Sequence, residues 1–358
     1  MPKNFGVRLR RLVLAFLPRL KQLILPAVLI VLLLVLLAYR PLWQSFLGRL
    51  IRSPQFISNL SRDPAESLRS TNQRTNILLL GMGGASHEAG DLTDSMILVS
   101  YSHASGKLSL ISLPRDLWVD SLKTKINAAY YWGEQRQAGG GGLILSKAAV
   151  EEVTGLPVHY ALAIDFTGFK QAIDLIGGVD VNVEKGFDDY EYPISGKEAA
   201  YPVEARYEHL HFDAGTQHMD GSLALKFVRS RHAEGEEGTD FARSARQRQV
   251  ILAFKNKALS SQTLLQPNKL AELANLYDQY IHTDITDADY GAFTRLALEV
   301  KPDQVQSISL STGEETLPKA LGILEVGNKN IYQGQYVLIA RDGNWATLKQ
   351  YLTNQLGN

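Results

Sequence analysis

Five arginines lie close together in the second half of this 358-residue sequence. Arg229, Arg231, Arg243, Arg246 and Arg248 fall within a stretch of 20 residues. Guanidinium groups present fixed pairs of N–H donors that match the oxygens of a phosphate or pyrophosphate. If residues 229–232 are extended, Arg229 and Arg231 point the same way, because strand side chains repeat every two residues. The stretch therefore favours an oxyanion-binding site.

Acidic residues occur at two earlier positions where strands are expected to begin or end. Asp94 stands at the entrance of an expected strand, where a carboxylate can project into a cleft. Arg115 and Asp116 directly follow another expected strand, at the end where open α/β sheets place ligands. Both positions are therefore candidates for ligand binding.

A third polar group lies on an expected helix. Asp240, Arg243 and Gln247 stand at positions i, i+3 and i+7, so they form one polar stripe on its surface. Carboxylate oxygens are ligands for hard cations, which share phosphate oxygens with a substrate. The spacing alone therefore suggests an oxyanion site beside carboxylates that could hold Mg²⁺.

Each of these signals has a structural alternative. Asp94 could cap a turn, and Arg115 and Asp116 could form a local salt bridge. His232, which follows the first two arginines, could be a structural or exposed histidine. The arginines could also pair with neighbouring acids on a solvated face, where each pair contributes little; these acids are Glu234, Glu236, Glu237 and Asp240.

Apolar runs and turn residues predict the elements that position these side chains. We expect strands at 77–80, 96–101, 108–113, 158–164 and 179–183, and helices at 143–153, 166–176 and 239–259. Gly177-Gly178 should end the second helix, and Thr239 or Asp240 should begin the third. Intermingled strands and helices predict an α/β fold. The third helix carries an apolar stripe through Phe241, Ala245, Ile251 and Phe254.

The first forty residues predict a membrane anchor. Leu23 to Tyr39 is a run of 17 residues without charge, about 25 Å long as a helix. Six basic residues precede it and three follow closely, so the positive-inside rule places the N-terminus in the cytoplasm. The alternative is a cleaved signal peptide, but no A-x-A-like site follows. We expect a cytoplasmic tail (1–22), a transmembrane helix (23–39), a linker (40–75) and an extracytoplasmic domain (76–358, with its core at 76–262).

The expected outer domain is acidic, although the whole chain has a net charge of zero. Residues 76–358 carry 25 Lys+Arg and 35 Asp+Glu. A field of this sign repels a nucleic-acid backbone, so it argues against a broad DNA- or RNA-binding face. The absence of cysteine excludes disulfides, thiolate metal sites and cysteine nucleophiles.

Taken in order along the chain, these clusters resemble the LytR-CpsA-Psr family of phosphotransferases. The resemblance is firm over residues 76–262 and weaker from there to the C-terminus. The predicted short tail, single anchor and outer domain are also the layout of that family. The matching stretches begin at Asn76 (NILLLG), Thr93 (TDSMILVS), Ser112 (SLPRD), Lys125 (KINAAY), Asp165 (DFTGF), Asp174 (DLIGGV), Asp220 (DGSLALKFVRSRH) and Thr239 (TDFARSARQRQ).

The resemblance implies a fold and a reaction. The fold would be a central mixed β-sheet flanked by helices. Such proteins take a glycopolymer from an undecaprenyl-type pyrophosphate carrier and attach it to peptidoglycan through a phosphodiester. The hydrocarbon tail of the carrier would lie in an apolar tunnel between the sheet and its covering helices.

The resemblance also implies roles for individual residues. Asp94 would help bind Mg²⁺ and is a candidate base for the attacking sugar hydroxyl of peptidoglycan. Asp240 would orient the arginines or contribute to the metal site. Asp94, Arg115, Arg229, Arg231 and Asp240 would form the catalytic set. The pyrophosphate would be held by Arg115, Arg229, Arg231, Arg243 and Gln247.

The sequence departs from the family pattern in three places. Leu92 replaces an arginine found in many relatives, and the loop 81–91 is unusually rich in glycine. Two extra residues lie between His232 and Asp240. Two other functions stay open: a hydrolase of the lipid pyrophosphate that uses water as nucleophile, and a membrane-anchored regulator that binds lipid or glycan.

Overall fold

The computed structural model describes residues 53–84, 91–197, 199–312, 322–341 and 343–357, together with Leu33. The predicted cytoplasmic tail and transmembrane helix (23–39) lie outside the described residues, apart from Leu33. Within the described part of the chain, none of the helices combines the length and apolar character needed to span a bilayer.

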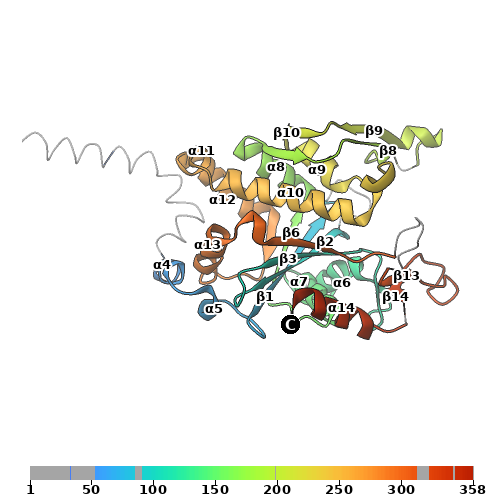
Figure 1. Ribbon diagram of the computed structural model, residues 1–358, viewed down its shortest axis with the longest axis horizontal. Helices are drawn as coiled ribbons and strands as arrows, with labels where there is room; N and C mark the ends of the chain where they lie inside the picture. The colour runs from blue at the N-terminus through green and yellow to red at the C-terminus, as the bar shows by residue number, and fades with distance from the viewer. Residues whose placement is uncertain are drawn as a thin grey trace, which may run out of the picture.

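A six-stranded mixed sheet forms the centre of the molecule (Figure 1). Three of its five pairs of neighbouring strands are antiparallel and two are parallel. The predicted central mixed sheet is therefore confirmed. In spatial order the strands are β11 (Ile281–Thr283), β6 (Tyr160–Asp165), β1 (Arg74–Met82), β2 (Thr93–Ser102), β3 (Leu108–Leu113) and β12 (Val305–Ser309).

Helices cover both faces of this sheet (Figure 1). Successive residues of a strand point to opposite faces, so Leu78 and Leu80 pack toward α7 (Gly141–Thr154) and α14 (Ala346–Leu356). Ile77 and Leu79 pack on the other face, toward α10 (Asp240–Ala258) and α13 (Tyr290–Glu299). α6 (Ala129–Arg136) packs against α7.

A second layer packs on the far side of α10. It has its own apolar cluster, centred on Phe187, Phe212 and Phe227. Two antiparallel ribbons complete this layer, and α12 packs against α8. The elements are α8 (Phe166–Ile176), α9 (Gly221–Arg229), α12 (Pro267–Tyr280), β7 (Val179–Val183) with β10 (Gly215–Met219), and β8 (Phe187–Pro193) with β9 (Tyr207–Phe212).

The remaining elements are short. The pairs β4 (Trp118–Val119) with β5 (Thr124–Lys125) and β13 (Leu324–Val326) with β14 (Leu338–Ala340) each form a small antiparallel ribbon. α11 (Ser261–Leu264) joins α10 to α12. The 3₁₀ turns are η1 (Ile126–Ala128), η2 (Val203–Arg206), η3 (Gly235–Gly238) and η4 (Pro302–Gln304).

Helix α10 begins as predicted, and its apolar stripe is partly packed: Ile251 and Phe254 contact the apolar clusters on its two sides. Thr239 is its N-cap and accepts a hydrogen bond from Ala242 N at 3.2 Å. Phe241, assigned to the buried apolar stripe, is instead 67% exposed, whereas Arg246 is only 3% exposed. The stripe prediction was wrong at Phe241. Arg246 can be buried because α10 lies between two layers, where the carbonyl groups of Phe227, Glu237 and Ser230 accept its hydrogen bonds in place of solvent.

Part of the predicted linker is packed. α4 (Pro54–Ser61) and α5 (Pro64–Ser67) both lie against α13. Asn59 Nδ2 donates to Ala288 O at 2.7 Å. The helices approach so closely that a Cβ on Gly291 would lie 2.3 Å from Phe56 O. Residues 54–67, within the segment predicted as linker, therefore pack against the domain.

Candidate functional site

Two sheet strands bring the first pair of predicted residues together. Asp94 is the second residue of β2, and Arg115 follows the end of β3, where Met96 pairs with Leu113. Arg115 Nη1 donates to Asp94 Oδ1. Arg115 Nε also lies 3.6 Å from Asp116 Oδ2. The guanidinium is thus held between two carboxylates at the edge of the sheet.

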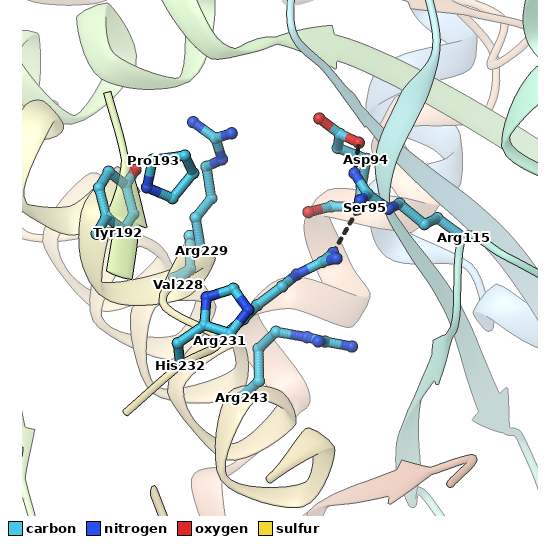
Figure 2. A pocket seen from close by; sticks show the side chains of 10 residues that line it. All are labelled: Asp94, Ser95, Arg115, Tyr192, Pro193, Val228, Arg229, Arg231, His232 and Arg243. Carbon is cyan, nitrogen blue, oxygen red and sulfur yellow. Dashed lines mark hydrogen bonds and ion pairs between the residues drawn. The ribbon is translucent and has the colours of Figure 1, made fainter. Parts of the chain in front are cut away.

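The second pair of predicted arginines comes from the end of α9. Arg229 is the last residue of this helix, and Ser230 ends it. The stretch 229–232 is therefore not a regular strand, so the condition of an extended segment is not met at Arg229. Arg229 and Arg231 nevertheless line one cavity together with Asp94, Arg115 and Arg243 (Figure 2).

The two guanidinium groups of this pair are held differently. The guanidinium of Arg229 lies 4.5 Å from the centre of the Phe166 ring and 5.9 Å from that of Tyr192. This geometry is a cation–π interaction, which positions the cation without neutralising it. Arg231 Nη2 donates to Asp94 O at 3.2 Å. Both charges remain available to an anion in the cavity.

Two buried charges that sequence reasoning missed hold the loop after α9. Asp189, in β8, is fully buried and accepts from Ser230 Oγ at 2.6 Å and from the amides of Arg231 and His232 at 3.2 and 3.3 Å. Arg246 Nη2 donates to Ser230 O at 2.9 Å. Ser230 is therefore fixed through its side chain by Asp189 and through its carbonyl group by Arg246.

No local signal identifies either role. Asp189 lies in an Asp-Asp pair that is typical of an exposed strand end, and Arg246 is one of five clustered arginines. The register of β8 against the loop at residue 230 is a tertiary feature. Only the assembled second layer shows that Asp189 and Arg246 position the loop, while Arg231 faces the cavity.

The electrostatics of the cavity favour an anion. Burial lowers the pKa of Arg231 to about 10, and repulsion by Arg243 and Arg115 adds to the effect. The charges of Asp94 and Asp240 oppose this shift without cancelling it. A bound oxyanion would relieve the repulsion. The lining consists of Asp94, Ser95, Arg115, Tyr192, Pro193, Val228, Arg229, Arg231, His232 and Arg243.

Asp240 and Gln247 lie at the margins of this cavity. Asp240, at the start of α10, pairs with Arg243 Nη1 at 2.7 Å. Of its two implied roles, this contact favours orienting an arginine over binding a metal. Gln247 Oε1 accepts from Ser112 Oγ at 3.2 Å and lines the neighbouring apolar cavity. The remaining predicted residues converge on the charged cavity itself.

The described residues offer a cation one carboxylate at this cavity. Asp94 lines it, whereas Asp240 does not. Across the described ranges, three or more histidine or acidic side chains nowhere gather around a common point. Arg115 occupies Oδ1 of Asp94, and Oδ2 has no hydrogen-bond partner among the described residues. Mg²⁺ commonly takes one or two carboxylates plus substrate phosphates, so Asp94 fits as one ligand of a shared site.

An apolar cavity of about 190 Å³ adjoins the charged one. It lies between β1, β2 and β6 on one side and α8, α9 and α10 on the other. It shares Ser95, Val228 and Arg229 with the charged cavity. Its apolar lining comes mainly from Leu79, Leu80, Ile97, Leu162, Ile164, Phe166, Phe169, Leu225, Val250 and Ile251.

A third, polar cleft of about 620 Å³ opens beside the charged cavity at the sheet edge. It shares Asp94, Arg115, Pro193 and Arg229 with that cavity. The site therefore combines an apolar compartment, a cationic compartment and a polar compartment. Arg229 lines all three.

Comparison with known proteins gives consistent relatives. The transferase named polyisoprenyl-teichoic acid–peptidoglycan teichoic acid transferase TagU of Oceanobacillus iheyensis is 33% identical over 238 residues, which is 64% of this chain and 66% of that protein. The TagU of Bacillus cereus is 32% identical over 208 residues, 57% of this chain and 59% of that protein. The chain thus spans about two thirds or less of the length of these relatives.

Solved structures share the fold. The crystal structure of B. subtilis TagV superposes with a TM-score of 0.52 and 23% identity, over 80% of this chain and 99% of that one. The sequence model of the LytR_cpsA_psr family matches residues 54–340, most of the chain. This protein therefore belongs to the LytR_cpsA_psr family.

Proposed function

We propose that this protein transfers a glycopolymer from a polyprenyl pyrophosphate carrier to peptidoglycan through a phosphodiester bond. The observation that carries the proposal is the junction of a cationic cavity with an apolar one. A polyprenyl pyrophosphate has a hydrocarbon chain joined to a polyanion, and the two cavities meet at Ser95, Val228 and Arg229. The relatives' names, which describe polyisoprenyl-linked teichoic acid transferases, support the same class of reaction.

Phosphoryl transfer requires positioning and charge neutralisation more than covalent chemistry. Arg115, Arg229, Arg231 and Arg243 would bind the two phosphates and stabilise the charge that develops on the transferred group. The oxygen of an acceptor hydroxyl attacks the phosphorus that carries the sugar and forms the new P–O bond. The bond from this phosphorus to the oxygen that bridges the two phosphates breaks. The lipid leaves as its monophosphate. Asp94 would accept the hydroxyl proton.

Mg²⁺ is part of the proposal. Asp94 would supply a carboxylate oxygen, and the pyrophosphate and water would supply the other ligands. When bound, the ion would neutralise part of the pyrophosphate charge. Chelation with EDTA should abolish transfer, and added Mg²⁺ should restore it; full activity in EDTA would refute this part of the proposal.

We also propose that residues 23–39 anchor the protein in the cell membrane, with the N-terminus in the cytoplasm and the enzymatic domain outside. This placement puts the site on the face where peptidoglycan lies. Protease added to intact spheroplasts should degrade the domain and spare the N-terminal tail. Protection of the domain would contradict the topology.

The decisive experiment compares Arg229→Ala and Arg231→Ala with the control Arg136→Ala. Arg136 is an exposed arginine at the end of α6, outside the three cavities. Each site variant should abolish attachment of glycan to the wall while folding normally, and the control should behave as the wild type. Product analysis distinguishes transfer from hydrolysis, because free phosphorylated glycan would indicate hydrolysis. Normal wall glycan in a strain that relies on either site variant would exclude this site.

A further inference from the structure

Most residues of the polar cleft beside the charged cavity have no part in the proposed binding of a lipid pyrophosphate; Arg115 and Arg229 line both spaces. The lining of the cleft mixes amide, hydroxyl and charged groups from segments far apart in the sequence. The wall of this cleft is built from the loop after β3, the β5–η1 segment, the end of β8 and the loop before β14. The residues that could contact a polar ligand are Asp116, Thr124, Lys125, Asn127, Ser195 and Gln335.

Asn127 is the most informative of these residues. It is only 7% exposed, yet it lines the cleft. Its backbone is fixed, because its amide donates to Arg115 O at 3.3 Å and its carbonyl accepts from Thr93 Oγ1 at 3.2 Å. Its side-chain amide makes no hydrogen bond with any residue that the structure describes. Its amide oxygen and nitrogen are open to the cleft, so a ligand bound there can replace water as their hydrogen-bond partner.

Two charged groups that line the cleft but not the charged cavity, Lys125 and Asp116, are paired with each other. Lys125 Nζ lies 2.7 Å from Asp116 Oδ1, and Asp116 Oδ2 lies 3.6 Å from Arg115 Nε. A ligand that entered here would meet amides, hydroxyls and mutually neutralised charges. That chemistry suits an uncharged polyol with both donors and acceptors, such as a sugar ring, better than it suits another phosphate.

The reaction assigns this sugar to one substrate. In an in-line displacement, the attacking oxygen approaches opposite the leaving group. The leaving lipid phosphate would depart toward the apolar cavity. Arg229 is the one residue among those described that lines both this cavity and the polar cleft. Asp94, the candidate base, lines the charged cavity and the cleft but not the apolar cavity. An acceptor hydroxyl in the cleft would therefore meet both the phosphorus and the base.

We propose that this cleft is the acceptor site, and that the side chain of Asn127 binds a sugar of the peptidoglycan glycan strand. The proposal rests on the transferase function proposed above. Asn127 and Gln335 bind the sugar, and Asp94 takes the proton of its hydroxyl as the new P–O bond forms. The lipid monophosphate departs on the other side.

The test uses the full-length protein in detergent and measures acceptor and donor separately. The variants are Asn127→Ala, Gln335→Ala in the loop before β14, and the control Asn182→Ala on an exposed position of β7. Transfer is followed with uncrosslinked peptidoglycan strands as acceptor. Binding is measured for a polyprenyl pyrophosphate and for the same lipid carrying one N-acetylhexosamine. We expect Asn127→Ala to raise the KM for the acceptor about tenfold and to leave both lipid affinities unchanged.

Other outcomes are equally decisive. If Asn127→Ala weakens binding of the sugar-bearing lipid but not of the plain lipid, the cleft holds the donor sugar and the acceptor assignment is wrong. If neither Asn127→Ala nor Gln335→Ala changes the acceptor KM or the lipid affinities, the cleft binds no sugar. If Asn127→Ala does not fold, Gln335→Ala alone decides between these results. Failure of the wild type to bind the plain lipid would instead overturn the proposed function.

Discussion

Replacing Arg231 with methionine should abolish function and at the same time stabilise the protein. Arg231 is largely buried, and Arg115 and Arg243 repel it. Among the described residues, the guanidinium of Arg231 makes one hydrogen bond, to Asp94 O at 3.2 Å. Such a cation costs folding free energy unless an anion is bound, because a buried charge must be compensated. Methionine is shorter and uncharged, and its flexible side chain fills irregular space well.

The expected magnitude follows from the pKa of Arg231. Its folded-state pKa of about 10 lies well below the ordinary arginine value, and the difference corresponds to roughly 3 kcal/mol of unfavourable free energy for the charged form. Neutral pH lies below both values, so this cost is fully present there. Loss of the hydrogen bond to Asp94 O offsets about 1 kcal/mol. The variant should therefore be more stable by about 1–2 kcal/mol.

The assay is equilibrium unfolding in urea, with and without inorganic pyrophosphate. The wild type should gain stability from pyrophosphate by mass action, and Arg231→Met should gain much less. Arg136→Met, at an exposed position, is the matched control. If the free energy of unfolding of ligand-free Arg231→Met is lower than that of the wild type by more than about 1 kcal/mol, Arg231 stabilises the fold and is not held in place for a bound anion.

Two further outcomes follow from the buried polar groups. Asp189→Ala leaves the hydroxyl of Ser230 and the amides of Arg231 and His232 without their acceptor. It should therefore lower the free energy of unfolding in urea by about 3–5 kcal/mol, whereas Asp188→Ala at the neighbouring position should have little effect. Equal effects of the two variants would show that Asp189 is not a positioning residue. Burial lowers the pKa of His159, and Asn76 N donates to its Nδ1 at 2.9 Å, which requires the neutral ring. Because the unfolded chain protonates His159 more readily than the folded protein, the free energy of unfolding should fall as the pH falls below about 6.5, by at most about 1.4 kcal/mol per pH unit. His159→Gln should flatten this pH dependence relative to the control His282→Gln. An unchanged slope in His159→Gln would contradict the neutral, buried state of His159.

The elements that depend on local sequence were predictable. The ranges expected for one helix and two strands match α8 (Phe166–Ile176), β7 (Val179–Val183) and β3 (Leu108–Leu113). Gly177 ends α8 in the left-handed region, at φ 88°, a conformation that glycine adopts without steric cost. In these stretches the apolar period, the caps and the tertiary environment agree.

The arrangement of Arg229 and Arg231 was only partly predictable. The residue types at 229 and 231 predicted an anion site, and the structure places both side chains in one cavity. Their arrangement could not be read from a period of two, because Arg229 ends a helix and the following loop is held by Asp189 from another layer. The exposed Phe241 and buried Arg246 have the same origin, since burial on α10 is set by which layers contact each face.

Arg229 shows how one side chain can serve three compartments. A carboxylate partner would fix its guanidinium but would also cancel the charge that an anion must meet. The chain instead places Phe166 and Tyr192 beside it, and no ion pair with Arg229 occurs among the described residues. The rings hold the cation and also extend the apolar cavity toward it, since Phe166 lines that cavity. Stacking therefore gives a permanent charge a fixed position at the boundary where hydrocarbon, pyrophosphate and sugar would meet.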